Sequence, residues 1–180
     1  KLGVNITYSF SSTLRGTAGA VMGFRNFIDG PFFVLYADNL TNLNLRKMYQ
    51  NHKKTGALGS IFLYKENMAD EDTTPGIVVL KEDSFIDKII EDPNKKEKTF
   101  LKNVPDKFKF TNSGIYILEK EVFEFIKAGV SDFAKQVFQE ILKKGLKLYG
   151  YRENCYIREI GQMNRYLKAK EEIESGKVVL

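Results

Sequence analysis

The sequence predicts an α/β protein in which helices cover both faces of a mostly parallel, mixed β-sheet. The first observation is that apolar runs of strand length alternate with segments in which apolar residues recur at helical spacing. The second is Phe32–Ala37, a continuous apolar run that ends at Asp38 and is typical of a strand buried on both faces. The third is the length, because 180 residues without a Pro- or Gly-rich linker fit a single domain.

Charge and cysteine content exclude several classes of protein. The 28 Lys and Arg residues exceed the 23 Asp and Glu residues by five, but the two signs are mixed along the chain. Such mixing is typical of a solvated surface, so we expect no nucleic-acid partner. No apolar run approaches the roughly 20 residues that cross a membrane, so we expect no membrane partner. The single cysteine, Cys155, excludes a disulfide framework and fits a reducing, cytoplasmic setting.

The first half of the chain alternates between strand and helix patterns. A helical pattern begins in the Gly-Thr-Ala-Gly segment at 16–19 and continues to Ile28. Asn44 can cap a second helix that ends near Gly56, and a polar turn at 81–84 joins two strands. The strands predicted here are 4–9, 32–37, 57–64, 76–80 and 85–90.

The second half contains a long strand and further helices. We expect 94–106 to form a polar, Lys-rich loop, because it lacks a periodic apolar pattern. Ser131 or Asp132 can cap a helix whose apolar face ends at Gly145. The remaining predicted elements are strands at 108–118, 146–151 and 155–160, a short helix at 119–127 and an amphipathic helix at 163–173.

Two carboxylates at the ends of predicted strands are the first candidates for a functional site. Asp38 follows strand 32–37, the usual place for a catalytic carboxylate in an open α/β sheet, although Asp is also an ordinary turn residue. Glu159 lies near the end of strand 155–160, where a plain surface Glu is the alternative. Together they could hold Mg²⁺, which proteins bind through one or two carboxylates plus substrate phosphates.

Three other features have a functional and a structural interpretation. Glycines at the start of a helix allow the backbone to approach a ligand, and the helix N–H groups favour anions, but this motif is weak and a plain turn with a Thr cap is the alternative for 16–19. His52 lies beside two lysines, so we expect it at the surface rather than in a site. We expect Cys155 to pack within its strand rather than to act as a nucleophile.

Six segments stand in a recognisable order along the chain. They are 14–20 (LRGTAGA), 32–42 (FFVLYADNLTN), 75–78 (PGIV), 90–93 (IEDP), 112–118 (NSGIYIL) and 156–161 (YIREIG). This series resembles the sugar-1-phosphate nucleotidyltransferases, and most nearly the mannose- or heptose-1-phosphate guanylyltransferase type, with the glucose-1-phosphate thymidylyltransferases as relatives. The resemblance implies a Rossmann-like nucleotidyltransferase fold in which residues 1–180 are the C-terminal larger part of a single domain.

The resemblance also implies a reaction and the residues for it. Such enzymes join a nucleoside triphosphate and a sugar 1-phosphate to give a nucleotide sugar and pyrophosphate, with Mg²⁺ as cofactor. By this similarity Asp38 and Glu159 are catalytic and hold the metal. The implied nucleotide-binding residues are Gly16, Thr17, Ala18 and Gly19, and the implied sugar-binding residues are Gly76, Glu91, Asn112 and Gly114.

Departures from the family pattern leave a second function open. The Gly-rich loop with which the family begins is absent from this sequence, as are the central strands that would separate 4–9 from 32–37. We therefore expect strand 4–9 to lack neighbours unless an N-terminal segment or a second copy completes the sheet. Asp92 stands where the family usually has Lys, and Glu159 where it usually has Asp. The alternative is a catalytically weakened homologue that binds a nucleotide sugar or serves as a regulatory subunit.

Overall fold

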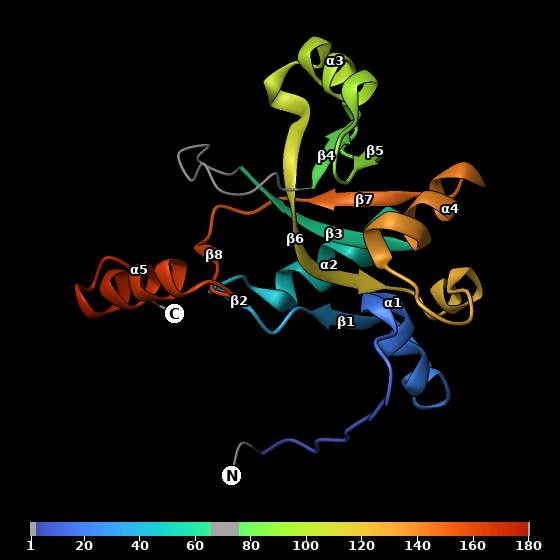
Figure 1. Ribbon diagram of the computed structural model, residues 1–180, viewed down its shortest axis with the longest axis horizontal. Coiled ribbons are helices and arrows are strands. Elements are labelled where there is room, and N and C mark those ends of the chain that lie inside the picture. Colours follow the sequence, from blue (N-terminus) through green and yellow to red (C-terminus); the bar gives the residue numbers. More distant parts are fainter. Residues whose placement is uncertain (1–2, 66–75, 180) are drawn as a thin grey trace.

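The described part of the chain, residues 3–65 and 76–179, forms two sheets and the helices around them in a computed structural model (Figure 1). The strands are β1 (Phe32–Leu35), β2 (Asn39–Thr41), β3 (Gly59–Tyr64), β4 (Ile77–Leu80), β5 (Ile86–Ile90), β6 (Lys109–Leu118), β7 (Leu148–Tyr151) and β8 (Ile157–Glu159). The α-helices are α1 (Gly16–Val21), α2 (Leu45–Thr55), α3 (Lys95–Asn103), α4 (Phe138–Lys143) and α5 (Met163–Glu174). Three 3₁₀ segments, η1 (Met22–Phe27), η2 (Asp106–Phe108) and η3 (Lys120–Phe125), and a π-helical turn, η4 (Phe133–Val137), complete the described elements.

The larger sheet is mixed and is organised around β6. Its strand order is β5-β4-β6-β3-β7, and β1 also pairs with β6. One edge of β6 pairs with β3, and the opposite edge pairs with β4 at 109–111 and with β1 at 115–118. The smaller sheet contains β2 and β8. The predicted α/β fold with a mixed sheet is therefore confirmed.

The expectation of mostly parallel pairing is wrong for the described strands. β3 and β7 are parallel, whereas β6 is antiparallel to β1, β3 and β4, and β4 is antiparallel to β5. The helix-connected strands β1 and β3 do run in the same direction, as the alternating pattern predicts. They are not neighbours, because β6 inserts between them.

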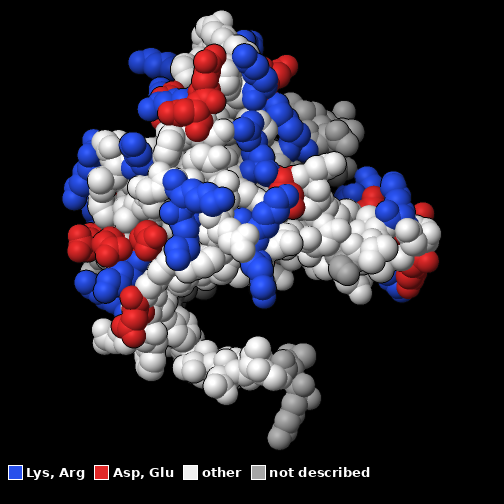
Figure 2. Space-filling model, turned by 180° about the vertical axis from the view of Figure 1, so that it is seen from behind, with Lys and Arg blue, Asp and Glu red and all other residues white. Residues whose placement is uncertain are grey.

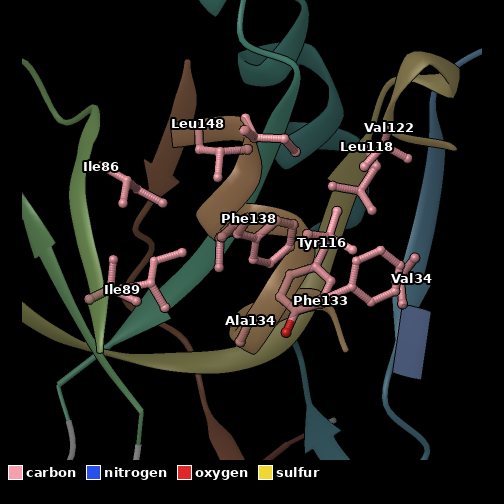
Figure 3. Close-up of a cluster of buried hydrophobic side chains, with 14 of the residues drawn as sticks. Val34, Ile86, Ile89, Tyr116, Leu118, Val122, Phe133, Ala134, Phe138 and Leu148 are labelled. Atoms are coloured by element: carbon pink, nitrogen blue, oxygen red, sulfur yellow. The ribbon is translucent and has the colours of Figure 1, made fainter. Parts of the chain in front are cut away.

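Helices and apolar side chains cover both faces of this sheet. On one face, Tyr116 of β6 lies against Phe133 and Phe138, with ring centroids 5.6 and 5.1 Å away, and the surrounding side chains are seen in Figure 3. On the other face, Met48 of α2 packs against a second cluster that includes Ile117 of β6 and Phe62 of β3. Successive residues of β6 thus point to opposite faces, which is the period of two of a strand.

Several element boundaries follow the sequence signals closely. Helix α2 begins after Asn44, whose side chain accepts a hydrogen bond from the Lys47 N–H, and it ends at Gly56 in the left-handed conformation. The turn at 81–84 joins β4 and β5 as expected. Helix α3 contradicts the predicted loop at 94–106, since Asn94 and Glu97 form a capping box and Leu101 is buried.

Two predictions about burial are also wrong. Strand β1 is not buried on both faces, since Leu35 is 50% exposed; among the described strands β1 pairs only with β6, so it lies at an edge of the sheet. Residues 4–9 do not form a strand, and none of the described strands pairs with them. Their side chains at Val4, Ile6 and Tyr8 are exposed, and this arm extends from the body without charged side chains (Figure 2). An isolated segment cannot form a ladder, so its alternating pattern has no partner to stabilise it.

Candidate active site

A cleft of about 320 Å³ lies where β1 and β4 follow one another along the same edge of β6. The Tyr36 N–H donates to the Gly114 carbonyl at 3.1 Å, and the Asn112 N–H donates to the Gly76 carbonyl at 3.2 Å. Gly114 has φ +73°, and a Cβ there would lie 2.6 Å from the Tyr36 ring. The residues between the two paired segments, 112–114, therefore form the floor between the end of β1 and the start of β4.

The carboxylates Asp38 and Glu159 are brought to one end of this cleft. The short strands β2 and β8 pair so that Asn39 lies opposite Glu159, and the Ile160 N–H donates to the Asp38 carbonyl at 2.7 Å. A Cβ on Gly161 would collide with Glu159 Oε1 and would lie 3.4 Å from Asp38 Oδ2. Both carboxylates therefore flank the same glycine, across 120 residues of sequence.

The two carboxylates differ in how their oxygen atoms are engaged. Glu159 Oε1 accepts the Gly161 N–H at 2.6 Å, and Glu159 Oε2 accepts from the Arg165 guanidinium. Asp38 is exposed to solvent. Among the described residues there is no group of three or more His, Cys, Asp or Glu side chains arranged to hold a metal. Two carboxylates with free lone pairs nevertheless match Mg²⁺, which takes its other ligands from water and substrate phosphates.

Glu91, with Gly76 and Asn112 beside it, defines a second end of the cleft. Glu91 follows β5 directly. Its carboxylate lies so close to Gly76 that a Cβ added to Gly76 would collide with it. Burial raises the pKa of Glu91, while a hydrogen bond with the Asn112 side chain opposes that rise. Gly76, Glu91, Asn112 and Gly114 all line the cleft. This end offers a carboxylate and an amide, which together can accept and donate hydrogen bonds to hydroxyl groups.

The Gly-Thr-Ala-Gly segment contributes one side chain to the cleft, that of Thr17. The Ala18 and Gly19 N–H groups both donate to the Ser131 carbonyl at 3.0 Å. A Cβ on Gly19 would lie 2.9 Å from the Gly129 carbonyl oxygen. These glycines therefore allow close packing against 129–131, and Ala18 is fully buried. The Thr17 hydroxyl donates to Asp132 at 2.9 Å.

The cleft residues that were not predicted from the sequence include four with ionisable side chains. Tyr36 extends from the end of β1, Asp132 and Lys135 come from η4 and the residue before it, and Arg165 lies in α5. Arg165 lies in the first turn of α5, and its guanidinium donates a hydrogen bond to Glu159 at the end of β8. Lys135 has no local signal, because its position depends on how its neighbours Phe133 and Val137 pack in the core.

Two residues outside the cleft, His52 and Cys155, can be compared with what the sequence predicted for them. His52 is buried rather than at the surface: its Nδ1 lies 2.8 Å from Ser60 Oγ and its Nε2 lies 3.2 Å from Glu119 Oε1. Its apparent polar context was misleading because Lys53 and Lys54 point away on the exposed side of α2. Cys155 precedes β8 instead of lying within a strand, but it packs beside the cluster around Met48, and burial raises the pKa of its thiol, which supports the packing interpretation.

Comparison with known proteins adds to this geometry. A family model described as nucleotidyl transferase matches residues 1–176. The chain belongs to the nucleotidyl transferase family. The resemblance read from the six sequence segments is thereby confirmed.

Members of this family with curated names are similar over most of the chain. The mannose-1-phosphate guanyltransferase of Saccharomyces cerevisiae is 29% identical over 170 residues, which is 92% of this chain and 43% of that protein. The protein of the same name from Candida albicans is 30% identical over 170 residues, with the same coverage of 92% and 43%. The chain therefore spans less than half the length of these relatives.

Solved structures share the fold of this family member. A UDP-glucose pyrophosphorylase complexed with UDP-glucose gives a TM-score of 0.72 at 19% identity, covering 94% of this chain and 66% of that one. HddC from Yersinia pseudotuberculosis, complexed with GMP-PN, gives 0.65 at 20% identity, covering 91% and 64%. In the described part of our chain, no helix is both long and apolar enough to traverse a bilayer.

Proposed function

We propose that the protein containing this chain transfers a nucleotidyl group from a nucleoside triphosphate to a sugar 1-phosphate. The observation that carries this proposal is one cleft with two chemically different ends. A pair of carboxylates, Asp38 and Glu159, flanks Gly161 at one end, and Glu91 with Asn112 lies at the other. The names of the relatives, mannose-1-phosphate guanyltransferases, make a mannose 1-phosphate and GTP the first substrates to test.

The carboxylate end suits a divalent cation. Asp38 and Glu159 would hold Mg²⁺, since their oxygen atoms lie on either side of one glycine and Mg²⁺ commonly binds one or two carboxylates together with phosphates. When bound, the ion would neutralise charge on the phosphates during transfer. Arg165, which is held by Glu159, places a second positive charge at this end of the cleft.

The remaining cleft residues would bind and orient the two substrates. In the proposed reaction, a phosphate oxygen of the sugar 1-phosphate attacks the α-phosphorus of the nucleotide as the bond to pyrophosphate breaks. Glu91 would accept hydrogen bonds from sugar hydroxyls, and the Asn112 amide would hold Glu91 in place. From the implied nucleotide-binding residues 16–19, the Thr17 hydroxyl is the group that reaches the cleft.

We also propose that residues 1–180 are the C-terminal larger part of one nucleotidyltransferase domain. Supporting this, the chain covers about two-thirds of the solved proteins that share its fold. Among the described strands β1 pairs only with β6, and its other edge is where further strands would extend the sheet. Such strands would come from an N-terminal segment or from a second copy.

The decisive test is pyrophosphate release. The protein is incubated with GTP, mannose 1-phosphate and Mg²⁺, with other nucleotides and glucose 1-phosphate as alternatives. Asp38→Asn should lower kcat at least about 100-fold, because a metal ligand contributes several kcal/mol to the stabilisation of the transition state. The matched control is Asp87→Asn, an exposed aspartate of β5 outside the cleft, which should leave kcat unchanged. Absence of turnover with every pair of substrates would overturn the transferase proposal.

A second candidate, nucleotide-sugar binding without turnover, is favoured by one observation. Glu159 is already engaged by the Arg165 guanidinium and by the Gly161 N–H, so it is a less available ligand than Asp38. Binding of GDP-mannose by calorimetry, combined with no pyrophosphate release at saturating substrates and Mg²⁺, would support this second function. Ordinary turnover would exclude it.

A further inference from the structure

Lys135 and Asp92 form an ion pair at the end of the cleft that contains Glu91. The Lys135 ammonium lies 2.7 Å from Asp92 Oδ2, and Lys135 itself lines the cleft. The wide turn of η4 produces this position, because the Asp132 side chain caps it while Phe133 and Val137 are anchored in the core. The backbone of Lys135 is thereby placed beside the cleft.

Lys135 is one of few positive charges in a cleft whose described charged residues are mostly carboxylates. Of the described residues that line it, four are carboxylates and two are cations, Lys135 and Arg165. A sugar 1-phosphate carries negative charge, so a cleft of this composition requires a cation wherever the phosphate sits. Arg165 belongs to the carboxylate end, where Glu159 holds it. Lys135 is the cation at the Glu91 end, where the proposed sugar-binding residues gather.

The two cations also differ in how easily they can change partners. The Arg165 side chain is 13% exposed and lies against a half-buried glutamate. The Lys135 and Asp92 side chains are 54% and 72% exposed, so their pair is a surface salt bridge of small net strength. A phosphate offers more charge and more acceptor oxygens than a carboxylate. Lys135 can therefore exchange Asp92 for a phosphate without a large loss.

We infer that Lys135 recognises the phosphate of the sugar 1-phosphate, and that Asp92 competes with this phosphate for the Lys135 ammonium. The inference rests on the proposed function and names the residue that distinguishes a phosphorylated sugar from a free one. Asp92 holds the lysine at the cleft when no substrate is bound. It is released from Lys135, and left to solvent, when the phosphate binds.

Competition gives the two residues of one ion pair opposite effects on binding. Lys135→Met removes the phosphate partner, so affinity for the sugar 1-phosphate should fall about tenfold, the usual effect of losing a charged hydrogen bond. Asp92→Asn removes the competitor and a nearby negative charge, so affinity should rise about threefold. A purely structural ion pair predicts that both variants weaken binding together.

The experiment is calorimetric titration of the protein and its variants with mannose 1-phosphate and glucose 1-phosphate, and with free mannose as the unphosphorylated probe. The matched control is the Lys143–Glu140 pair, a surface salt bridge of 3.1 Å in α4 that lies outside the cleft. Lys143→Met and Glu140→Gln should leave affinity unchanged. Urea unfolding of each variant checks that the fold is retained.

Each outcome decides between the proposals. Weaker binding by Lys135→Met and tighter binding by Asp92→Asn, with free mannose unaffected by either, would support the inference. If the wild-type protein binds a sugar 1-phosphate and Lys135→Met binds it equally well, Lys135 is not the phosphate-recognition residue and the proposed function still stands. If the wild-type protein binds neither sugar 1-phosphate, the proposed function itself is overturned, and this inference with it.

Discussion

Strand β3 has a polar cluster at each end, and the two clusters differ in access. At its beginning, Ser60, His52 and Glu119 form a chain of hydrogen bonds of 2.8 and 3.2 Å. At its end, Tyr64 lines the open cleft that also contains Glu91. Ser60 is fully buried and His52 is 1% exposed, so these two side chains are sealed from solvent, and Glu119, which is 35% exposed, closes the cluster toward the surface.

The comparison shows that residue types alone do not make a catalytic site. Serine, histidine and a carboxylate in a hydrogen-bonded chain have the composition of a hydrolase triad. In this protein no substrate can reach Ser60. The hydrogen bonds of His52 instead connect α2 to β3 and to the end of β6. The cleft has no such chain, but its carboxylate and amide groups are reachable by a ligand. The two ends of β3 therefore differ in whether a ligand can reach them and in whether their polar groups can still form hydrogen bonds.

The largest expected effect is at the sealed end. His52→Ala would remove a buried ring and leave Ser60 and Glu119 without their partner, so the free energy of unfolding should fall by about 2–3 kcal/mol. Affinity for a sugar 1-phosphate should stay unchanged in the folded fraction. Urea unfolding and calorimetric titration measure the two quantities. A loss of affinity without a loss of stability would mean that the sealed cluster acts in binding.

Gly114→Ala tests the floor of the open end. The residue has φ +73°, and the added Cβ would lie 2.6 Å from the Tyr36 ring, so backbone strain and a clash act together. We expect a loss of about 2 kcal/mol in the free energy of unfolding, accompanied by weaker sugar 1-phosphate binding. Gly145→Ala is the matched control, because it shares a positive φ of 73° but has nothing within 4 Å of the added Cβ. Equal effects at both sites would show that strain alone, without the Tyr36 contact, explains the loss.

Glu91→Gln should separate binding from stability at the open end. Burial raises the pKa of Glu91 in the folded protein above its value in the unfolded chain. Its contribution to stability is therefore complete below the pKa of the unfolded chain, about 4.3, and is lost as pH rises through the pKa of the folded protein. Since Gln is neutral throughout, the variant should be at least as stable as wild type at pH 7. Sugar 1-phosphate affinity should fall about tenfold through loss of a charged acceptor. A clear loss of stability at pH 7 would contradict this account.

The smallest effect is the pH dependence of the sealed end. Burial lowers the pKa of His52, while the Glu119 hydrogen bond partly opposes this. The unfolded chain therefore takes up a proton more readily, and stability is lost as pH falls below about 6.5. His52 is the one histidine of the sequence, so its share of the pH dependence is measured by comparing urea midpoints at pH 7.5 and 5.5 between wild type and a His52 variant. His52→Asn should show a smaller difference between the two midpoints. An unchanged difference would assign the pH dependence to other groups.

The sequence predicted best the elements that carry their own start and end signals. Helix α2 carries its own cap at Asn44 and its own stop at Gly56, and both were readable from the chain. Helix α3 has a capping box as well, but its many lysines concealed the signal. The strand pattern at 4–9 failed for the opposite reason. Alternation is a condition for a strand, whereas a neighbouring strand is what stabilises it.

The α/β class, the family, and the candidate residues Asp38, Glu91, Asn112 and Glu159 were readable from the amino-acid order, because they depend on periodicity and on motifs within short segments. Which of these residues meet depends on how distant segments pack. β6 inserts between β1 and β3, β2 pairs with β8, and η4 delivers Lys135 to the cleft. Packing also sealed His52 against Ser60. Contacts between segments far apart in sequence arise from packing, and no local pattern encodes them.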